Sequence, residues 1–267
     1  MSMKKYFLVT DLDGTLLNSN HEISEYNYKQ IKQFQQKNGL FTFATGRMND
    51  SVYRFIKELN ITIPVITYNG AQVFCPLENK VIYEKSFVLS KEMYNQLAEV
   101  SFAEIIFYYD DQAFTLKKDD LIKEFEQKEK VTCKVMASEK IPEKVTKIML
   151  LSEDRRKLEE LEIDFKARFE SVSFIFSESN YLEILPKNVS KGEALKEVKR
   201  LYELKDIYTV GFGNNLNDIS LLEAANQGIA VKNSVTGLLD VADQVSPYTN
   251  NEHAVGHYIE SLLVNSG

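Results

Sequence analysis

The sequence predicts an α/β fold: a parallel, doubly wound sheet with helices on its faces, interrupted by an inserted α+β segment. Three observations predict it. Strand-like and helix-like segments alternate from residue 6 to residue 68, and this βαβαβ order is typical of a parallel sheet. Paired strand-like runs replace that order between residues 84 and 186. The α/β alternation then resumes and continues to the end of the chain.

The first predicted strand covers residues 6–10, an apolar run too short for a helix. It ends at Asp11 and Asp13, two carboxylates one residue apart, and Gly14 follows. Because the chain turns at Gly14, both carboxylates can face one crevice at the carboxyl end of the strand, where open α/β sheets bind ligands. Two carboxylates this close repel each other unless a cation lies between them. A hard divalent cation with oxygen ligands, Mg²⁺ above all, is the natural counterion.

The next elements complete the first βαβαβ run. Ser24 is a good N-cap for a helix that ends at Asn38-Gly39, and residues 40–44 form the second predicted strand. A second helix and a third strand over 64–68 follow. The second strand leads into Thr45-Gly46, and a hydroxyl beside a bare backbone amide suits a phosphate oxygen. A helix-capping threonine explains the same residues equally well.

A hairpin over 72–85 leads into the inserted segment, where alternation of polar and apolar residues predicts a sheet with one face covered by helices. The predicted helices are 90–102, 119–130 and 153–169, and the predicted strands are 105–109, 113–117, 147–151, 173–177 and 181–185.

After this segment, Ser190 caps a helix whose first turn carries Lys191. A lysine is disfavoured there by the helix dipole, which hints at an anionic partner, although a solvated surface lysine is the simpler alternative. A strand over 207–212 then leads into the polar loop 213–218. The chain closes with a strand over 228–231, a short edge strand over 244–246 and a helix over 252–264.

Composition limits the partners. The net charge is −7 and the basic residues are dispersed, which argues against nucleic acid or an anionic membrane as the main partner but not against a small phosphorylated one. Cys75 and Cys133 are the only cysteines and indicate reduced thiols in a reducing compartment. No run is long enough for a signal peptide or a membrane span, so we expect a cytoplasmic protein.

Four of these pieces together resemble the motifs of the haloacid dehalogenase (HAD) superfamily. They are D-L-D-G-T-L from Asp11, Thr45 at the second strand end, S-K-G-x-A-L from Ser190, and the loop G-N-N-L-N-D from Gly213. The size and position of the insertion resemble the Cof-type phosphatase subgroup. The resemblance covers both core segments and implies a Rossmann-like core over 1–83 and 187–267, with an α+β cap domain over 84–186.

The resemblance also implies roles for single residues. Asp11 would be the nucleophile and Asp13 the general acid/base, with Mg²⁺ held by Asp11, Asp13 and Asn214 and with Asp218 beside them. The subgroup usually carries an aspartate at position 214, so we expect Asn214 to weaken metal binding. The phosphoryl group would be held by the remaining motif residues, namely Leu12, Thr45, Gly46, Arg47, Lys191 and Asn217.

The implied activity is Mg²⁺-dependent hydrolysis of small phosphomonoesters, such as sugar phosphates, through an aspartyl-phosphate. Two alternatives remain open: a phosphotransferase or phosphomutase that passes the phosphoryl group to a second alcohol, and a phosphometabolite-binding protein without turnover. Candidate residues for reading the leaving group are Tyr108, Tyr109, Asp110 and Asp111.

The three histidines receive structural interpretations. His21 is interpreted as a turn residue after the first motif. His253 and His257 are four residues apart on the predicted C-terminal helix and are interpreted as a surface or packed pair rather than metal ligands.

Overall fold

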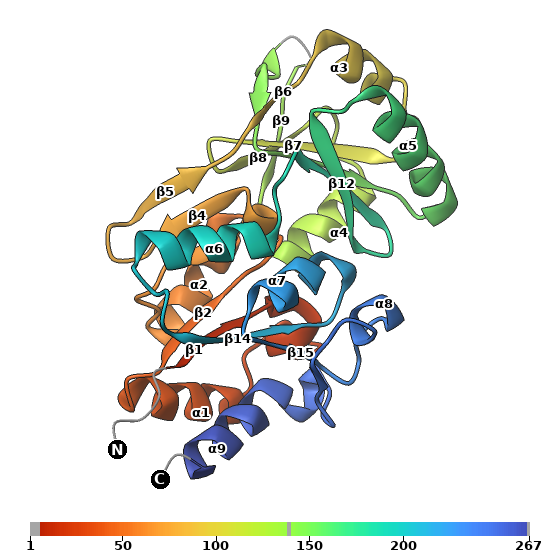
Figure 1. Ribbon diagram of the computed structural model, residues 1–267. Coiled ribbons are helices and arrows are strands. Elements are labelled where there is room, and N and C mark those ends of the chain that lie inside the picture. The colour runs from red at the N-terminus through yellow and green to blue at the C-terminus, as the bar shows by residue number, and fades with distance from the viewer. Residues whose placement is uncertain (1–5, 138–139, 266–267) are drawn as a thin grey trace. The chain divides into compact units, whose positions relative to one another are not determined.

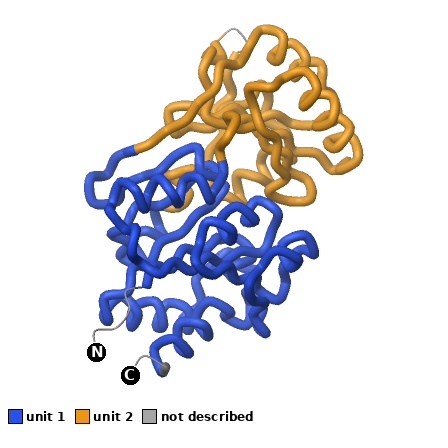
Figure 2. Tube along the Cα trace, viewed as in Figure 1, with its two compact units in different colours: residues 1–46, 53–82, 190–267 blue, residues 47–52, 83–189 orange. Residues whose placement is uncertain are grey.

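A computed structural model describes residues 6–137 and 140–265, and the chain forms two compact units (Figure 2). The first unit takes in the described residues up to 46, residues 53–82 and the described residues from 190 onward. The second unit takes in residues 47–52 and the described residues of 83–189. No helix of the described part of the chain is long and apolar enough to cross a membrane.

The first unit is built on a five-stranded parallel sheet with the strand order β16-β15-β14-β1-β2. The interior strands β1 and β14 consist mainly of fully buried residues, as expected for a sheet covered on both faces. The predicted α/β class is confirmed. The strands are β1 (Tyr6–Thr10), β2 (Leu40–Phe43), β14 (Tyr208–Gly213), β15 (Gln227–Ala230) and β16 (Gln244–Val245).

Helices cover both faces of this sheet (Figure 1). Helix α1 (Glu25–Gln36) packs against α9 (Ala254–Asn265) on one side, and α6 (Lys191–Leu201) packs against α7 (Ile219–Ala224) on the other. The predicted cap of α1 is present, since Ser24 Oγ accepts a hydrogen bond of 3.1 Å from Asn27 N. The remaining helices are α2 (Asn49–Leu59) and α8 (Thr236–Leu239).

The third predicted strand differs from expectation. β3 (Val65–Thr67) joins the parallel sheet through a single bridge, Ala44 to Ile66, and otherwise pairs antiparallel with β4 (Gln72–Cys75). β5 (Lys80–Glu84) completes a separate three-stranded sheet. The reason is the turn after β3, where Tyr68 and Asn69 have φ values of 51° and 52° and the chain folds back on itself.

The second unit holds a six-stranded sheet with the order β12-β13-β11-β7-β8-β9. One sheet face packs on helices through an apolar cluster that includes Leu97, Phe107, Ile148, Leu158 and Phe165. The helices are α3 (Lys91–Ala98), α4 (Asp120–Glu129) and α5 (Arg155–Arg168). The strands are β6 (Phe87–Val88), β7 (Glu104–Tyr109), β8 (Gln112–Thr115), β9 (Cys133–Val135), β10 (Lys144–Val145), β11 (Lys147–Leu151), β12 (Val172–Glu178) and β13 (Tyr181–Pro186).

Three strands of this unit were not predicted. β6 and β10 form a two-residue antiparallel ladder, which is too short to leave an alternating pattern in the sequence. β9 joins the sheet edge by parallel pairing with β8, and its exposed residues lack the apolar alternation of a half-buried strand.

Candidate active site

The site lies at the carboxyl edge of the parallel sheet, where three adjacent strands end. Thr10 pairs with Phe43 of β2 and with Phe212 of β14, so the residues that follow these strands emerge side by side. Main-chain bonds of 2.9 Å extend this register, from Asp11 N to Phe212 O and from Ala44 N to Thr10 O. The fold therefore gathers the motif residues after β1, β2 and β14 at one edge.

The turn after β1 requires Gly14 for two reasons. Its φ is +73°, a conformation that side chains with a Cβ rarely adopt. A Cβ placed there would also lie 2.4 Å from Nδ2 of Asn214. The glycine thus lets the first motif and the loop after β14 approach each other closely.

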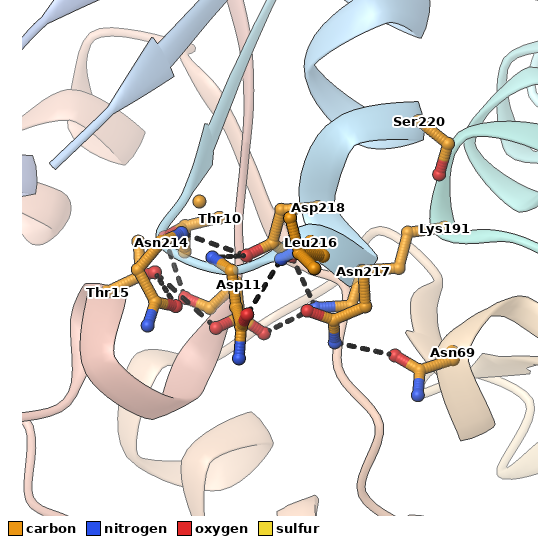
Figure 3. A network of polar contacts seen from close by, with 12 residues as sticks. Thr10, Asp11, Thr15, Asn69, Lys191, Asn214, Leu216, Asn217, Asp218 and Ser220 are labelled. Atoms are coloured by element: carbon orange, nitrogen blue, oxygen red, sulfur yellow. Dashed lines mark hydrogen bonds and ion pairs between the residues drawn. The ribbon is translucent and has the colours of Figure 1, made fainter. Parts of the chain in front are cut away.

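Lys191 is fully buried and bridges two carboxylates (Figure 3). Its Nζ lies 2.6 Å from Oδ1 of Asp11 and 2.6 Å from Oδ1 of Asp218. Burial by itself would lower the pKa of Lys191, but the two carboxylates outweigh it and raise the pKa above its usual value. The lysine is therefore a permanent cation at the nucleophile candidate.

Two local features place Lys191. Ser190 caps α6, because its Oγ accepts a bond of 3.1 Å from Glu193 N, as the sequence predicts. Gly192 lets α6 approach α7, since a Cβ there would lie 2.0 Å from the carbonyl oxygen of Ser220. The first turn of α6 is thereby held against the first turn of α7.

Asp218 is fully buried, and both of its carboxylate oxygens accept hydrogen bonds. Oδ1 accepts from Lys191, and Oδ2 accepts from the backbone N–H groups of Asn214 at 2.9 Å and Asn215 at 3.1 Å. The carboxylate thus fixes both Lys191 and the loop after β14, so it orients the neighbouring site residues.

Asn214 faces three oxygens through one atom of its side-chain amide. This atom lies 2.9 Å from Thr15 Oγ1, 2.9 Å from the carbonyl oxygen of Asp13 and 3.2 Å from Oδ2 of Asp11. When the atom is Nδ2, its two hydrogens serve these acceptors. When it is Oδ1, it lies 2.9 Å from the carbonyl oxygen of Asp13 and 3.2 Å from Oδ2 of Asp11. These distances are about the spacing of neighbouring oxygen ligands around an octahedral Mg²⁺.

These donors fit a magnesium ion. Asp11, Asp13 and Asn214 would hold it through a carboxylate, a main-chain carbonyl and an amide oxygen, all of them hard oxygen ligands. In the described residues no group of three or more histidine, cysteine, aspartate and glutamate side chains is arranged to hold a metal ion. The candidate set is consistent with this, because only one of its three donors is a charged side chain.

Asp11 itself is only 6% exposed, so burial disfavours the ionised form of its carboxyl group. Burial raises the pKa of Asp11 to about 7; Lys191 opposes the rise, and the charges of Asp218 and Asp13 add to it. A cation at the Oδ2 side of Asp11 would favour the ionised form, as Lys191 does at the Oδ1 side.

Asp13 is less buried than Asp11 and contacts a histidine. Its side chain is 30% exposed, and its Oδ1 lies 3.1 Å from Nδ1 of His21. His21 lies in a turn, as predicted, with φ of 57°. Sequence reasoning missed its contact with Asp13, for which the spacing of the two residues gives no signal.

A chain of polar contacts links the second and fourth motifs. Thr45 is buried, and its carbonyl oxygen accepts a bond of 2.9 Å from Asn69 N. Asn69 Oδ1 accepts a bond of 3.0 Å from Asn217 Nδ2 (Figure 3). Asn217 Oδ1 is buried and has no hydrogen-bond partner among the described residues. Asn69 was missed as a site residue, because an Asn-Gly pair is first of all a turn signal.

Residues 47–52 group with the second unit through contacts inside it. Arg47 Nη1 lies 3.4 Å from Oε2 of Glu129, and Asn49 N donates a bond of 3.2 Å to Oδ1 of Asp111. The domain prediction assigned these six residues to the core segment. No run of sequence could indicate this grouping, because it depends on partners more than 60 residues away.

The four candidates for reading a leaving group have structural partners or a turn position. Tyr108 is buried beneath Lys147, whose Nζ lies 4.7 Å from the ring centroid. Tyr109 stacks on Phe114 at 4.5 Å. Asp110 and Asp111 have φ values of 48° and 53° and form the turn between β7 and β8.

His253 and His257 pack on aromatic rings. His253 precedes α9 with φ of 64°, so the prediction that both lie on one helix is wrong; a 3₁₀ turn over Asn250–Glu252 replaces the first helical residues. His257 stacks on Tyr248 at 4.0 Å, and both histidines contact Tyr26. The interpretation as a packed pair fits these contacts.

Residues 8–259 match the family of haloacid dehalogenase-like hydrolases. The chain belongs to this family. The predicted superfamily, its Cof-type subgroup and the prediction of an enzyme of this type are confirmed.

Named relatives cover nearly the whole chain. The phosphatase YwpJ of Bacillus subtilis is 28% identical, over 96% of this chain and 99% of its own. The 5-amino-6-(5-phospho-D-ribitylamino)uracil phosphatase YitU of the same organism is 25% identical, over 98% and 99%. Among solved structures, TM0651 of Thermotoga maritima superposes with a TM-score of 0.81 at 33% identity, over 97% of each chain.

Proposed function

We propose that this hydrolase is a Mg²⁺-dependent phosphatase of small phosphomonoesters and that it works through an aspartyl-phosphate on Asp11. The observation that carries the proposal is the environment of the Asp11 carboxylate. Its Oδ1 accepts a hydrogen bond of 2.6 Å from the Lys191 cation. Its Oδ2 lies beside the candidate metal ligands, the side-chain amide of Asn214 and the carbonyl oxygen of Asp13. A buried carboxylate held between a cation and a cation site is suited to attack an anionic phosphoryl group.

In the proposed first step, a carboxylate oxygen of Asp11 forms a bond to phosphorus. The bond from phosphorus to the leaving oxygen breaks, and Asp13 gives its proton to that oxygen. Lys191 balances charge on the nucleophile, and Thr45 with the amides of Leu12, Asp13 and Gly46 would hold the phosphoryl oxygens. Asn217 has a buried acceptor without a partner among the described residues, which would suit a protonated or hydrated ligand group.

In the proposed second step, Asp13 takes a proton from a water molecule as that water attacks phosphorus. The bond between phosphorus and the Asp11 oxygen breaks, which releases inorganic phosphate and restores both carboxyl groups. Mg²⁺, held by Asp11, Asp13 and Asn214, would supply Lewis-acid charge to the phosphoryl oxygens when it is bound. Asp218 would hold the loop after β14 in position, and Lys191 would hold the carboxylate of Asp11.

We further propose that the second unit acts as a cap that reads the leaving group and excludes water. The relatives support a small phosphorylated metabolite as substrate, since one of them is named for a phosphorylated ribityl compound. Arg47, which directly follows the Thr45-Gly46 pair in the sequence, would help to bind the phosphoryl group.

The test is phosphate release from a nitrophenyl phosphate and from a panel of phosphorylated metabolites, with Mg²⁺ or with EDTA. We expect release by wild type with Mg²⁺ and loss of at least about a thousandfold in Asp11→Asn, because the nucleophile is gone. Asp206→Asn, the same substitution at an exposed position of the first unit, is the control. Full activity of Asp11→Asn would contradict the proposal. Metabolite binding without release would favour a binding protein, and phosphate transfer to an added sugar would favour a phosphotransferase.

A further inference from the structure

His21 contacts the candidate general acid/base and is not part of any family motif in the sequence. Its Nδ1 lies 3.1 Å from Oδ1 of Asp13, and the two side chains are 34% and 30% exposed. Asp13 lies in the turn Leu12–Leu16, whose backbone at Asp13 is extended rather than helical, with φ of −74° and ψ of 123°. The carboxylate is therefore carried on a short turn at the rim of the site, where a contact with a neighbouring side chain can decide its direction.

Hydrogen bonds fix the main chain of the turn that carries His21. His21 N donates a bond of 2.9 Å to Asn18 O, and its own carbonyl oxygen accepts a bond of 3.2 Å from Nη2 of Arg54. The turn is closed by a bond of 3.0 Å from Asn18 N to Glu22 O, while Asn18 Oδ1 accepts from the N–H groups of Asn20 and Glu22.

His21 adopts the left-handed region, with φ of 57°. That region favours glycine and, among residues with a side chain, asparagine, aspartate and histidine, so the turn accepts an imidazole but does not require one. Glycine and asparagine would satisfy the turn equally well, but only a side chain with a polar atom can make the 3.1 Å contact with Asp13.

We infer that His21 is a positioning residue, which donates a hydrogen bond from Nδ1 to one oxygen of Asp13 and so aims the other oxygen at the leaving group. The inference rests on the proposed function, because it concerns the proton transfer in the first step. A carboxyl group that an additional hydrogen bond holds within reach of the leaving oxygen donates its proton more effectively than one that is held less firmly.

The inference predicts a dependence on the leaving group. When an alkyl phosphate is cleaved, the departing alkoxide is strongly basic and must receive the proton of Asp13 as its bond to phosphorus breaks. A nitrophenolate leaves without that proton. Loss of His21 should therefore slow the first step for alkyl phosphates and leave it nearly unchanged for nitrophenyl phosphate.

Two substitutions separate the hydrogen bond from the backbone. Glycine and asparagine both accept the positive φ of position 21. His21→Gly removes the side chain, whereas His21→Asn keeps an amide nitrogen at the position of Nδ1 that can donate to Asp13. Circular dichroism and thermal unfolding establish that both variants are folded before their kinetics are compared.

The experiment measures kcat/KM, which reports the steps through departure of the alcohol, at one fixed pH and saturating Mg²⁺. For His21→Gly we expect kcat/KM to fall by about tenfold to a hundredfold with the best alkyl phosphate, because a general acid contributes at least that much. With nitrophenyl phosphate we expect kcat/KM to fall by less than about threefold. His21→Asn should stay within about threefold of wild type on both substrates.

Equal losses of His21→Gly on the two substrates, or a His21→Asn variant as slow as His21→Gly with alkyl phosphate, would overturn the inference while leaving the proposed function intact. If wild type released phosphate from neither substrate, the proposed function would be overturned, and the inference with it.

Discussion

The side-chain amide of Asn214 lies 2.9 Å from the main-chain carbonyl oxygen of Asp13. With Nδ2 toward that oxygen, the amide satisfies by hydrogen bonds the same groups that would bind a metal. With Oδ1 toward it, the amide becomes a metal ligand itself. Binding of Mg²⁺ at this edge therefore requires the amide to present its oxygen, which an aspartate would do in any orientation.

Asn214→Asp tests this account of the metal site. The added carboxylate joins Asp11 and Asp218 in a buried cluster, so the variant should unfold at a lower temperature than wild type in EDTA. The extra charge should also strengthen Mg²⁺ binding by about tenfold or more, because ligand charge tunes the affinity of such sites. Thermal unfolding across a Mg²⁺ titration measures both effects without depending on activity.

Asn95→Asp, the same substitution at an exposed position of α3, is the matched control for that experiment. An Asn214→Asp variant that responds to Mg²⁺ as wild type does would contradict the assignment of the metal site to this residue.

Lys191→Met should be strongly destabilising. The substitution leaves Asp11 and Asp218 buried without the cation that each contacts at 2.6 Å. Removal of one partner from a buried ion pair costs about 3–5 kcal/mol, so we expect a loss of that size in urea denaturation. Lys196→Met on the same helix removes an exposed pair with Glu193 and should cost less than about 1 kcal/mol. Similar midpoints for the two variants would rule out this description of Lys191.

The stability of the metal-free protein should depend on the ionisation of Asp11. Burial raises the pKa of Asp11 from 3.8 to about 7, so the folded protein binds this proton more tightly than the unfolded chain. The protonated Asp11 carboxyl group therefore contributes its full share to the free energy of unfolding below pH 3.8. This share is lost as the pH rises towards about 7. In EDTA, the difference in unfolding free energy between wild type and Asp11→Asn should fall as the pH rises through this window. A difference that grew with pH would contradict the sign of the shift.

Gly192→Ala should destabilise the first unit and displace Lys191. The new Cβ would lie 2.0 Å from the carbonyl oxygen of Ser220, and a backbone atom cannot move aside cheaply. Overpacking of this kind typically costs about 1–3 kcal/mol. Gly237→Ala is the control, because its Cβ would meet only the methyl Cδ2 of the exposed Leu216 at 2.8 Å. Denaturation midpoints of the two variants measure the difference, and equal midpoints would argue against a close approach of α6 and α7.

The sequence was sufficient for the features that local patterns encode. Strand β1 and the capped start of α6 follow from apolar runs and a serine cap. Their order along the chain, together with the α/β alternation, predicts that their ends meet at one sheet edge. The class of the fold and the position of Lys191 in the first turn of a helix are therefore predictable from a single sequence.

Features that depend on distant partners were not predictable. Asn69 and Asn217 are 148 residues apart, and their hydrogen bond follows from a left-handed turn that brings the first residue back toward the sheet edge. The contact of His21 with Asp13 likewise depends on the path of a tight turn rather than on a spacing. The orientation of the Asn214 amide depends on three oxygens, one of them a main-chain carbonyl, which no sequence pattern displays.

The central claim is that Asp11 becomes phosphorylated, and Asp13→Asn offers the most direct measurement of it. With nitrophenyl phosphate the first step needs little proton donation, whereas the second step lacks its general base, so the intermediate should accumulate. After acid quenching, mass spectrometry of the peptides should find one phosphoryl group on Asp11 and none in an Asp11→Asn, Asp13→Asn double variant. A phosphoryl group on any other residue, or fast turnover by Asp13→Asn with no phosphorylated peptide, would contradict the account.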